Sequence, residues 1–208
     1  MPGSDCLSGI FVGGQSSRMG GTPKGLLEPP GTGHCVVEHL VSLLVSCHLG
    51  DIVLVGRHQA YHDLNLPFVD DAPIGSGPMA GLLGLVDYAA PLGYEFVLAI
   101  ACDMPGISRT LLQRLQREKR QANALVPRRE HWEPLCARYR VSAVQPLLRH
   151  LLGEGQSRMM SLLDTIGTGR VELELDASEA KALVDWDSPG DLPEGVCFRG
   201  KTWGSREK

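Results

Sequence analysis

The chain of 208 residues is long enough for one α/β domain with a substantial core, and 43% of its residues are hydrophobic against 21% that are charged. This balance is typical of a folded, soluble protein and excludes a disordered chain. The formal net charge of -4 argues against a nucleic-acid partner, and the longest apolar stretches, such as residues 96–102, are too short to span a membrane.

The six cysteines indicate a reducing compartment. None of them forms a Cys-x-x-Cys pair, and no spacing of cysteine and histidine suggests zinc. They lie in or beside apolar runs, as buried thiols do. Because the first residues also lack the basic start and the apolar stretch of a secretory signal, we expect a cytoplasmic protein.

Hydrophobic patterning predicts alternating strands and helices over the first 125 residues. An apolar run at 7–12 ends at two glycines, and Pro78 is well placed to open a helix. Ser108 can cap a further helix with apolar positions at Leu111, Leu112 and Leu115. The expected strands are 7–12, 52–55, 66–69, 96–100 and 124–126, and the expected helices are 36–47, 78–88 and the one after Ser108.

The rest of the chain is less regular. The pattern indicates strands at 134–139 and 171–175, helices at 144–152 and 158–166, and a loop at 185–189 that leads to a short terminal helix. No internal repeat and no low-complexity linker interrupts the chain. The sequence therefore predicts a single domain over residues 1–208.

The alternation of strands and helices predicts the α/β class, with a mostly parallel sheet covered on both faces. Ligands of such sheets bind outside the carboxyl ends of the strands. Gly13-Gly14, Asp70-Asp71 and Asp103 all follow predicted strands. We therefore expect these residues to share one site.

The segment from Gly13 to Lys24 reads GGQSSRMGGTPK and carries the strongest chemical signal. Its glycines let the backbone turn sharply and expose N–H groups to an anion, and Arg18 and Lys24 supply positive charge for a triphosphate. The spacing is neither that of a Walker A loop nor that of a dinucleotide fingerprint. An ordinary surface loop with solvated charges is the alternative for a glycine-rich stretch taken alone.

This segment resembles the glycine-rich signature of the MobA-like nucleotidyltransferases. GPMAG at 77–81 is similar to the family's G-P-L-A-G, and CDMP at 102–105 is similar to its C-D-x-P. EPLCARY at 133–139 resembles the P-L-x-A-x-Y stretch, and DWDSPGDL at 185–192 resembles the closing D-x-D-T-P-E-D-L. The five motifs occur in order and cover nearly the whole chain.

The resemblance implies a three-layer α/β/α Rossmann-like nucleotidyltransferase fold, with a nucleotide-binding part at 1–125 and an acceptor-binding part at 126–200. It implies transfer of GMP from GTP to molybdenum-bound molybdopterin, with Mg²⁺, and delivery of the product to molybdoenzymes or their chaperones. The alternatives are CTP with molybdopterin, or a nucleoside triphosphate with a sugar or alcohol phosphate. A more remote one is a nucleotide-binding protein without turnover.

The same resemblance assigns roles to the charged residues. Asp103 would hold Mg²⁺, because a hard cation prefers carboxylate oxygen, and Asp187, or else Asp185, would be the second ligand. Lys24 and Arg18 would neutralise the phosphates. The alternatives are a capping role for Asp103 before Pro105 and a surface turn at 185–187.

The nucleoside would contact the ends of the first strands. Phe11, Val12, Gly13 and Gly14 match the family segment at the base and sugar, and Val55 stands near a further base position. Asp71, with Asp70 as rival, would accept hydrogen bonds from the N–H groups of guanine, although aspartate also favours turns.

Some positions depart from the family pattern and leave the base preference open. Val12 stands where the family often has Ala, Val55 near a polar position, and Asp185 and Asp187 where the guanylyl branch has Asn. The stretch at 28–34 is longer than expected and has no assigned role. The candidates for binding the acceptor are Arg128, Arg129, His131, Arg138 and Arg158. A solvated surface side chain is the alternative for each of them.

Overall fold

The computed structural model describes residues 5–13, 23–72, 77–198 and 201–202. Its centre is a seven-stranded sheet of order β4-β3-β1-β5-β7-β6-β8. β7 is antiparallel to β5 and β6, and the other neighbouring strands are parallel. The strands are β1 Cys6–Phe11, β3 Ile52–Val55, β4 Phe68–Val69, β5 Phe96–Ala101, β6 Ala124–Pro127, β7 Cys136–Arg140 and β8 Arg170–Leu173.

The two central strands, β1 and β5, are buried along their whole length. Their sequences are nearly continuous apolar runs, which is what burial on both faces demands. Side chains alternate between the faces: Phe96, Leu98 and Ile100 enter one core cluster, while Val97 and Ala99 enter the other. The sheet is therefore the middle of three layers.

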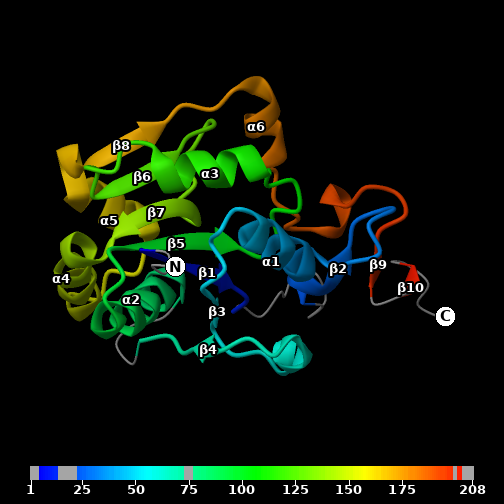
Figure 1. The fold of residues 1–208 in the computed structure, drawn as a ribbon, viewed down its shortest axis with the longest axis horizontal. Coiled ribbons are helices and arrows are strands. Elements are labelled where there is room, and N and C mark those ends of the chain that lie inside the picture. Colours follow the sequence, from blue (N-terminus) through cyan, green and yellow to red (C-terminus); the bar gives the residue numbers. More distant parts are fainter. Residues whose placement is uncertain (1–4, 14–22, 73–76, 199–200, 203–208) are drawn as a thin grey trace.

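Helices cover both faces of the sheet, which runs from β8 to β4 in Figure 1. α1 and α3 pack in the first core cluster, and α2, α4 and α5 pack in the second. A small helix, α6, follows β8. The helices are α1 Val36–Ser46, α2 Gly77–Ala89, α3 Arg109–Arg117, α4 Val141–Gly153, α5 Met159–Ile166 and α6 Ala177–Ala182.

Local signals in the sequence set several helix starts. Ser108 Oγ accepts a hydrogen bond from the Leu111 amide at 3.2 Å, as a helix cap does. Glu38 Oε2 accepts one from the Cys35 amide at 2.9 Å at the start of α1, and Pro78 is in the first turn of α2. These capping residues confirm the predicted positions of the helices.

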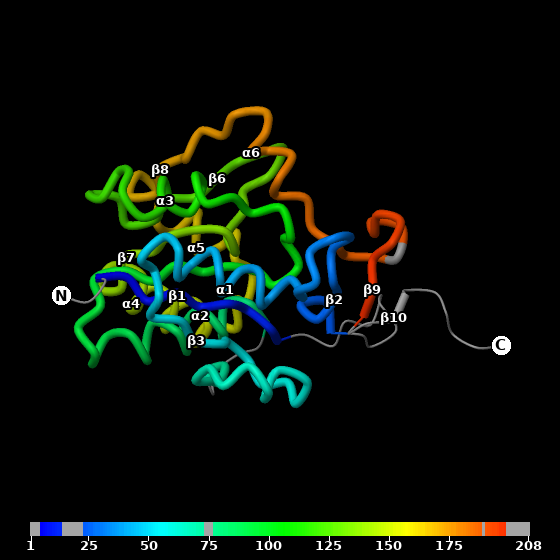
Figure 2. Tube along the Cα trace, turned by 45° about the vertical axis from the view of Figure 1, so that its right-hand side comes forward, coloured from blue at the N-terminus to red at the C-terminus, as the bar shows by residue number. Residues whose placement is uncertain are grey.

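A second sheet of three short strands lies beside the main one, and Figures 1 and 2 both show it apart from β4 and β8. It has the order β10-β9-β2 and pairs β2 Leu27–Glu28 with β9 Cys197–Phe198, which pairs with β10 Lys201–Thr202. The sequence did not indicate this sheet. It gives residues 27–28 a structural role as a partner of the C-terminal segment.

The predicted class, three layers and mostly parallel sheet are confirmed, with corrections to single elements. The strand expected at 66–69 is limited to Phe68–Val69, and the terminal helix is one 3₁₀ turn at Pro189–Asp191. α6 and a 3₁₀ segment at Gln59–Leu64, labelled η3, were not expected. Among the described residues no helix is long and apolar enough to cross a membrane. The division at residue 125 stays a prediction.

Candidate functional site

A pocket of about 430 Å³ opens at the carboxyl ends of the central strands. Phe11, Val12 and Gly13 line it at the end of β1, Val55 at the end of β3, and Asp103 beyond β5. Asp71, two residues after β4, also reaches it. The structure thus brings together Gly13, Asp71 and Asp103, as the strand-end argument predicts.

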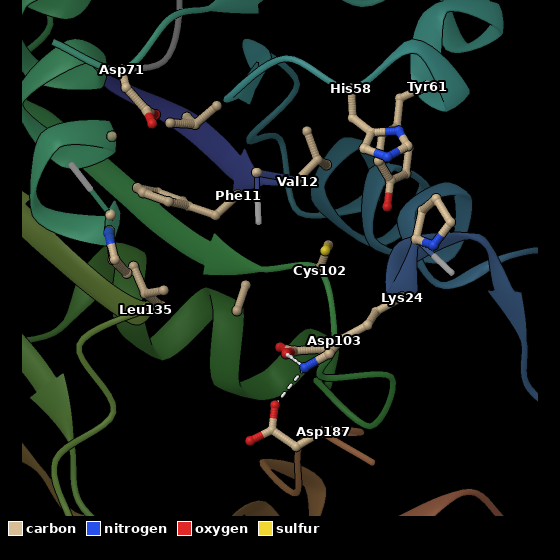
Figure 3. A pocket seen from close by; sticks show the side chains of 17 residues that line it. Phe11, Val12, Lys24, His58, Tyr61, Asp71, Cys102, Asp103, Leu135 and Asp187 are labelled. Carbon is tan, nitrogen blue, oxygen red and sulfur yellow. Dashed lines mark hydrogen bonds and ion pairs between the residues drawn. The ribbon is translucent and has the colours of Figure 1, made fainter. Parts of the chain in front are cut away.

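Lys24 lies between two carboxylates at one end of this pocket (Figure 3). Its Nζ donates to Asp103 Oδ2 at 3.1 Å and also to Asp187 Oδ1. Lys24 begins the 3₁₀ turn η2, Lys24–Leu26, while Asp187 comes from the loop after α6. Three segments far apart in the chain therefore converge on one ammonium group.

Burial and charge act against each other at this cluster. Burial by itself lowers the pKa of Lys24, but the hydrogen bonds and charges of Asp187 and Asp103 outweigh it and raise the pKa above its ordinary value. Burial raises the pKa of Asp103, and the Lys24 ammonium offsets part of that rise. Lys24 therefore stays charged. The charge of Lys24 offsets only part of the effect of burial on Asp103.

The opposite end of the pocket has Asp71 as its acid. A Cβ atom on Gly81 of α2 would lie 3.0 Å from the Phe11 ring and 3.2 Å from Asp71 Oδ1, so a side chain there would displace pocket residues. Burial raises the pKa of Asp71, and the nearby charge of Asp70 adds to this. Asp71 thus lies where a ligand's N–H groups can meet a carboxylate.

Asp70, the neighbour of Asp71 in the chain, pairs with Arg57 and does not line the pocket. Both of its oxygens accept hydrogen bonds from Arg57, one of them from Nη2 at 3.1 Å, and this partner holds the pKa of Asp70 below its ordinary value. The pair is exposed and is not part of the pocket lining. Of the two rival positions, Asp71 is the one that lines the pocket.

Glycine is required where the ends of β1 and β3 meet. Gly56 has a φ of +84°, and a Cβ atom on it would lie 2.8 Å from the Cα of Gly13. The Gly13 amide in turn donates to the Val55 carbonyl at 3.2 Å. The two strand ends are therefore held close together, and Gly13 lines the pocket beside them. Gly14 and Arg18, also predicted for the site, lie outside the described residues.

Asp103 and Asp187 fit a divalent cation by their chemistry. Both present carboxylate oxygens to the same point, the ammonium of Lys24, and hard cations prefer such oxygens together with water and phosphate. Asp185 instead accepts a hydrogen bond from Arg129 at 3.3 Å. Within the part of the chain that the structure describes, no group of three or more His, Cys, Asp or Glu side chains could hold a metal alone. A cation held by these two carboxylates would complete its donor set with water and with phosphate oxygens of a substrate.

Sequence reasoning missed part of the lining. His58 and Tyr61, from the start of η3, form one wall, and Leu135 and Pro78 also reach the pocket. His58 Nδ1 accepts from the Ala60 amide at 3.2 Å, and its ring meets that of Tyr61 edge-on. The available sequence signal was His58 itself, because a polar side chain that can accept from the amide two residues later indicates the start of a helical turn.

The suggestion that Arg138 binds an acceptor is wrong. The side chain is 1% exposed and donates to carbonyls at the end of α3 and just beyond, because it lies under that helix on β7. Arg129 pairs with Glu133 and Asp185, and Arg128 lies 3.8 Å from Glu172. The carbonyls that Arg138 contacts belong to Leu115, Gln116, Glu118 and Lys119.

A mostly parallel sheet with its pocket at the carboxyl ends, a glycine-lined end beside Asp71 and a lysine held by two carboxylates is the arrangement that a nucleotidyltransferase needs. The model of the MobA-like NTP transferase domain matches residues 9–170. The chain belongs to the MobA-like NTP transferase family, whose members generally use a divalent metal.

Relatives agree in sequence and in fold. A probable molybdenum cofactor guanylyltransferase of Chloroflexus aggregans is 31% identical, over 97% of this chain and 99% of its own. The molybdenum cofactor guanylyltransferase of Yersinia pestis is 30% identical, over 88% and 90%.

Solved structures share the fold. Molybdopterin-guanine dinucleotide biosynthesis protein A of Archaeoglobus fulgidus has a TM-score of 0.71 at 22% identity, over 89% of this chain and 94% of its own. A 2-C-methyl-D-erythritol 4-phosphate cytidylyltransferase of Thermus thermophilus has a TM-score of 0.62 at 15% identity, over 89% and 95%.

Proposed function

We propose that this protein transfers GMP from GTP to molybdenum-bound molybdopterin, giving molybdopterin guanine dinucleotide and pyrophosphate. Two relatives at 30% identity or more, each matched over most of its length, are named as molybdenum cofactor guanylyltransferases. Family membership supports the reaction class, and the names of these relatives support the substrates.

The observation that carries the proposal is the polarity of the pocket. Asp71 is at one end, and the Lys24, Asp103 and Asp187 cluster is at the other. A guanine base offers an N–H and an amino group on one edge, which a carboxylate accepts. A triphosphate needs positive charge and a metal at the far end. A single GTP molecule matches both ends.

The reaction is an in-line displacement at the α-phosphorus. An oxygen of the acceptor's terminal phosphate forms a new bond to that phosphorus, and the bond to the β-phosphate bridging oxygen breaks. The electron pair leaves with pyrophosphate, and no covalent enzyme intermediate is needed. Lys24 neutralises charge on the phosphates, and Arg18 adds to this from the glycine-rich segment.

Asp103 and Asp187 would hold Mg²⁺. When bound with the nucleotide, the ion would supply positive charge that offsets the negative charge of the phosphates. Asp103 is suited to this role. Burial disfavours its carboxylate form and so raises its pKa, and a bound cation would stabilise that form. Phe11, Val12, Gly13 and Val55 exclude water from the nucleoside, and the family resemblance adds Gly14 to this set.

The acceptor would bind against the part of the chain at 126–200. Leu135 lines the pocket there, and the ion pairs of Arg129 with Glu133 and Asp185 lie beside it. We place the reaction in the cytoplasm, which the buried thiols Cys35, Cys47, Cys102 and Cys136 favour. The finished cofactor would then pass to a molybdoenzyme or its chaperone.

The test is pyrophosphate release with Mg²⁺ and molybdenum-loaded molybdopterin, compared among GTP, CTP, ATP and UTP. We expect GTP to be preferred. Asp103→Asn should lower the rate about 10³-fold, because the metal loses one of its two carboxylate ligands. Asp70→Asn is the matched control, because Asp70 pairs with Arg57 outside the pocket.

The outcomes separate the candidates. A preference for CTP would keep the reaction and replace the base, as the aspartates at 185 and 187 in the closing motif allow. Release with a sugar or alcohol phosphate as acceptor, and none with molybdopterin, would replace the acceptor. Tight binding of GTP, with no release of pyrophosphate whichever acceptor is supplied, would overturn the enzyme assignment.

A further inference from the structure

Tyr61 is a buried residue of the pocket wall to which the proposed reaction gives no task. It is 1% exposed, and its ring extends from η3 towards the segment that carries Lys24 (Figure 3). Its hydroxyl accepts a hydrogen bond from the Gly25 amide at 3.2 Å. The peptide unit that joins Lys24 to Gly25 is therefore tied to η3.

The backbone at Gly25 has little room to move. A Cβ atom there would lie 2.5 Å from Val37 of α1, 2.9 Å from the Tyr61 hydroxyl and 3.2 Å from the Cys102 Cβ. Gly25 is thus enclosed by three elements. Only glycine fits at this position, and the chain beside Lys24 is held by packing as well as by the hydrogen bond.

Tyr61 also reaches the chain beside Asp103. Burial raises the pKa of Tyr61, with the neighbouring Cys102 thiol as a further cause, so its hydroxyl keeps its proton at neutral pH. Tyr61 and Cys102 both flank Gly25, at 2.9 Å and 3.2 Å from the position of a Cβ atom there. Tyr61 is thus bonded to the residue after Lys24, and the residue before Asp103 packs in the same enclosure.

We propose that Tyr61 is a positioning residue, which fixes Lys24 against Asp103 through the Gly25 amide. This inference rests on the proposed function, in which Lys24 meets the charge that develops on the phosphates. A shift of the Lys24 backbone of about 1 Å is enough to cost a large part of the rate in a preorganised site. Tyr61 acts through Lys24 and does not touch the reacting atoms.

The test is Tyr61→Phe, which keeps the ring and removes the hydroxyl. We expect kcat to fall about tenfold, while KM for GTP stays within about twofold, because the transition state depends on the placement of Lys24 more than ground-state binding does. The Gly25 amide should exchange its hydrogen faster, since it loses its acceptor. Kinetics and residue-resolved hydrogen exchange measure these effects on the full chain.

Ser8→Ala is the matched control. Ser8 Oγ donates to the Leu49 carbonyl at 3.2 Å inside the core, so this variant also loses one buried hydroxyl bond, away from Lys24. It should keep the wild-type kcat. If both variants lose the same fraction of kcat, the effect is general destabilisation and the positioning role is wrong.

Two results distinguish this inference from the proposed function. A wild-type kcat in Tyr61→Phe, or an unchanged exchange rate at Gly25, overturns the role of Tyr61 and leaves the guanylyl transfer intact. An inactive wild-type protein with GTP and molybdopterin overturns the transfer. The exchange rate at Gly25 still tests the link to Tyr61 in that case, because it does not require turnover.

Discussion

Asp71 and Asp70 are neighbours in the chain with different surroundings, so their variants should behave differently. Asp71 lines the pocket, whereas Asp70 is paired with Arg57. Under the proposed function, Asp71→Asn loses about 1 to 3 kcal/mol of base discrimination, because the amide offers one acceptor oxygen where guanine needs two. The ratio of kcat/KM for GTP over CTP measures this.

Asp70→Asn is the control for that ratio and should leave it unchanged. Asparagine at 70 removes the partner of an exposed arginine, and exposed ion pairs contribute little. Equal losses in the two variants would show that the acidic pair acts through the fold of the loop. In that case neither aspartate reads the base.

Acidification should weaken GTP binding at a higher pH than an ordinary aspartate allows. Burial raises the pKa of Asp71, and the charge of Asp70 raises it further. An acid with a raised pKa holds its carboxylate form above that pKa and loses it as the pH falls through it. KM for GTP should therefore rise on acidification, and Asp70→Asn should move that rise to lower pH. A KM profile that is identical in both proteins contradicts this.

Residues at strand ends were predictable because topology places them together. Gly13, Asp71 and Asp103 follow apolar runs that predict strands, while Lys24 was predicted from the glycine-rich segment. The residues alone did not decide between Asp70 and Asp71, which the family resemblance ranked first, because the choice depends on Arg57 across a turn. Tyr61 was missed for a similar reason: its partner at Gly25 is far away in the chain.

At the scale of elements, α3 depends on a side chain from the strand beneath it. Arg138 of β7 donates to four carbonyls at and beyond the end of α3, at 2.5 to 3.0 Å. Helix ends leave such carbonyls without partners. Arg138→Leu should therefore lower the free energy of unfolding by about 3 kcal/mol and leave KM for the acceptor unchanged. Urea unfolding and steady-state kinetics measure the two effects.

Arg120→Leu is the control for Arg138. Its guanidinium also lies over the Phe96 ring, at 4.6 Å from the centroid compared with 4.7 Å for Arg138. Arg120 is 40% exposed and pairs with Asp5 and Glu95, so its loss should cost less than about 1 kcal/mol. A raised KM for the acceptor in Arg138→Leu alone, with normal stability, would restore the acceptor-binding interpretation.

Elements with a strong local signal were predictable, and those fixed by distant pairing were not. α3 has its cap at Ser108, and β5 is a long apolar run. The antiparallel direction of β7 leaves no mark in its composition, because a buried strand reads alike in both directions. The two-residue strands β2 and β9 are too short for any alternation to appear.

At the scale of the whole molecule, the small sheet links both sides of the Lys24 ion pairs. β2 begins directly after η2, which contains Lys24, and β9 lies ten residues after Asp187. The pairing of Leu27 with Phe198 and Glu28 with Cys197 joins these two stretches. The C-terminal segment therefore limits how far Lys24 and Asp187 can separate.

Removal of residues 193–208 tests this link. Val196 is 2% exposed and belongs to the core cluster of Leu26 and Leu27, and burying a valine contributes about 1.5 to 3 kcal/mol. We expect a lower unfolding midpoint, together with a several-fold loss of kcat/KM at temperatures where the truncated protein is fully folded. Removal of 203–208 alone keeps β9 and β10 and should keep both values. Full activity in the longer truncation, with only the midpoint lowered, would show that the small sheet stabilises the fold without positioning Lys24.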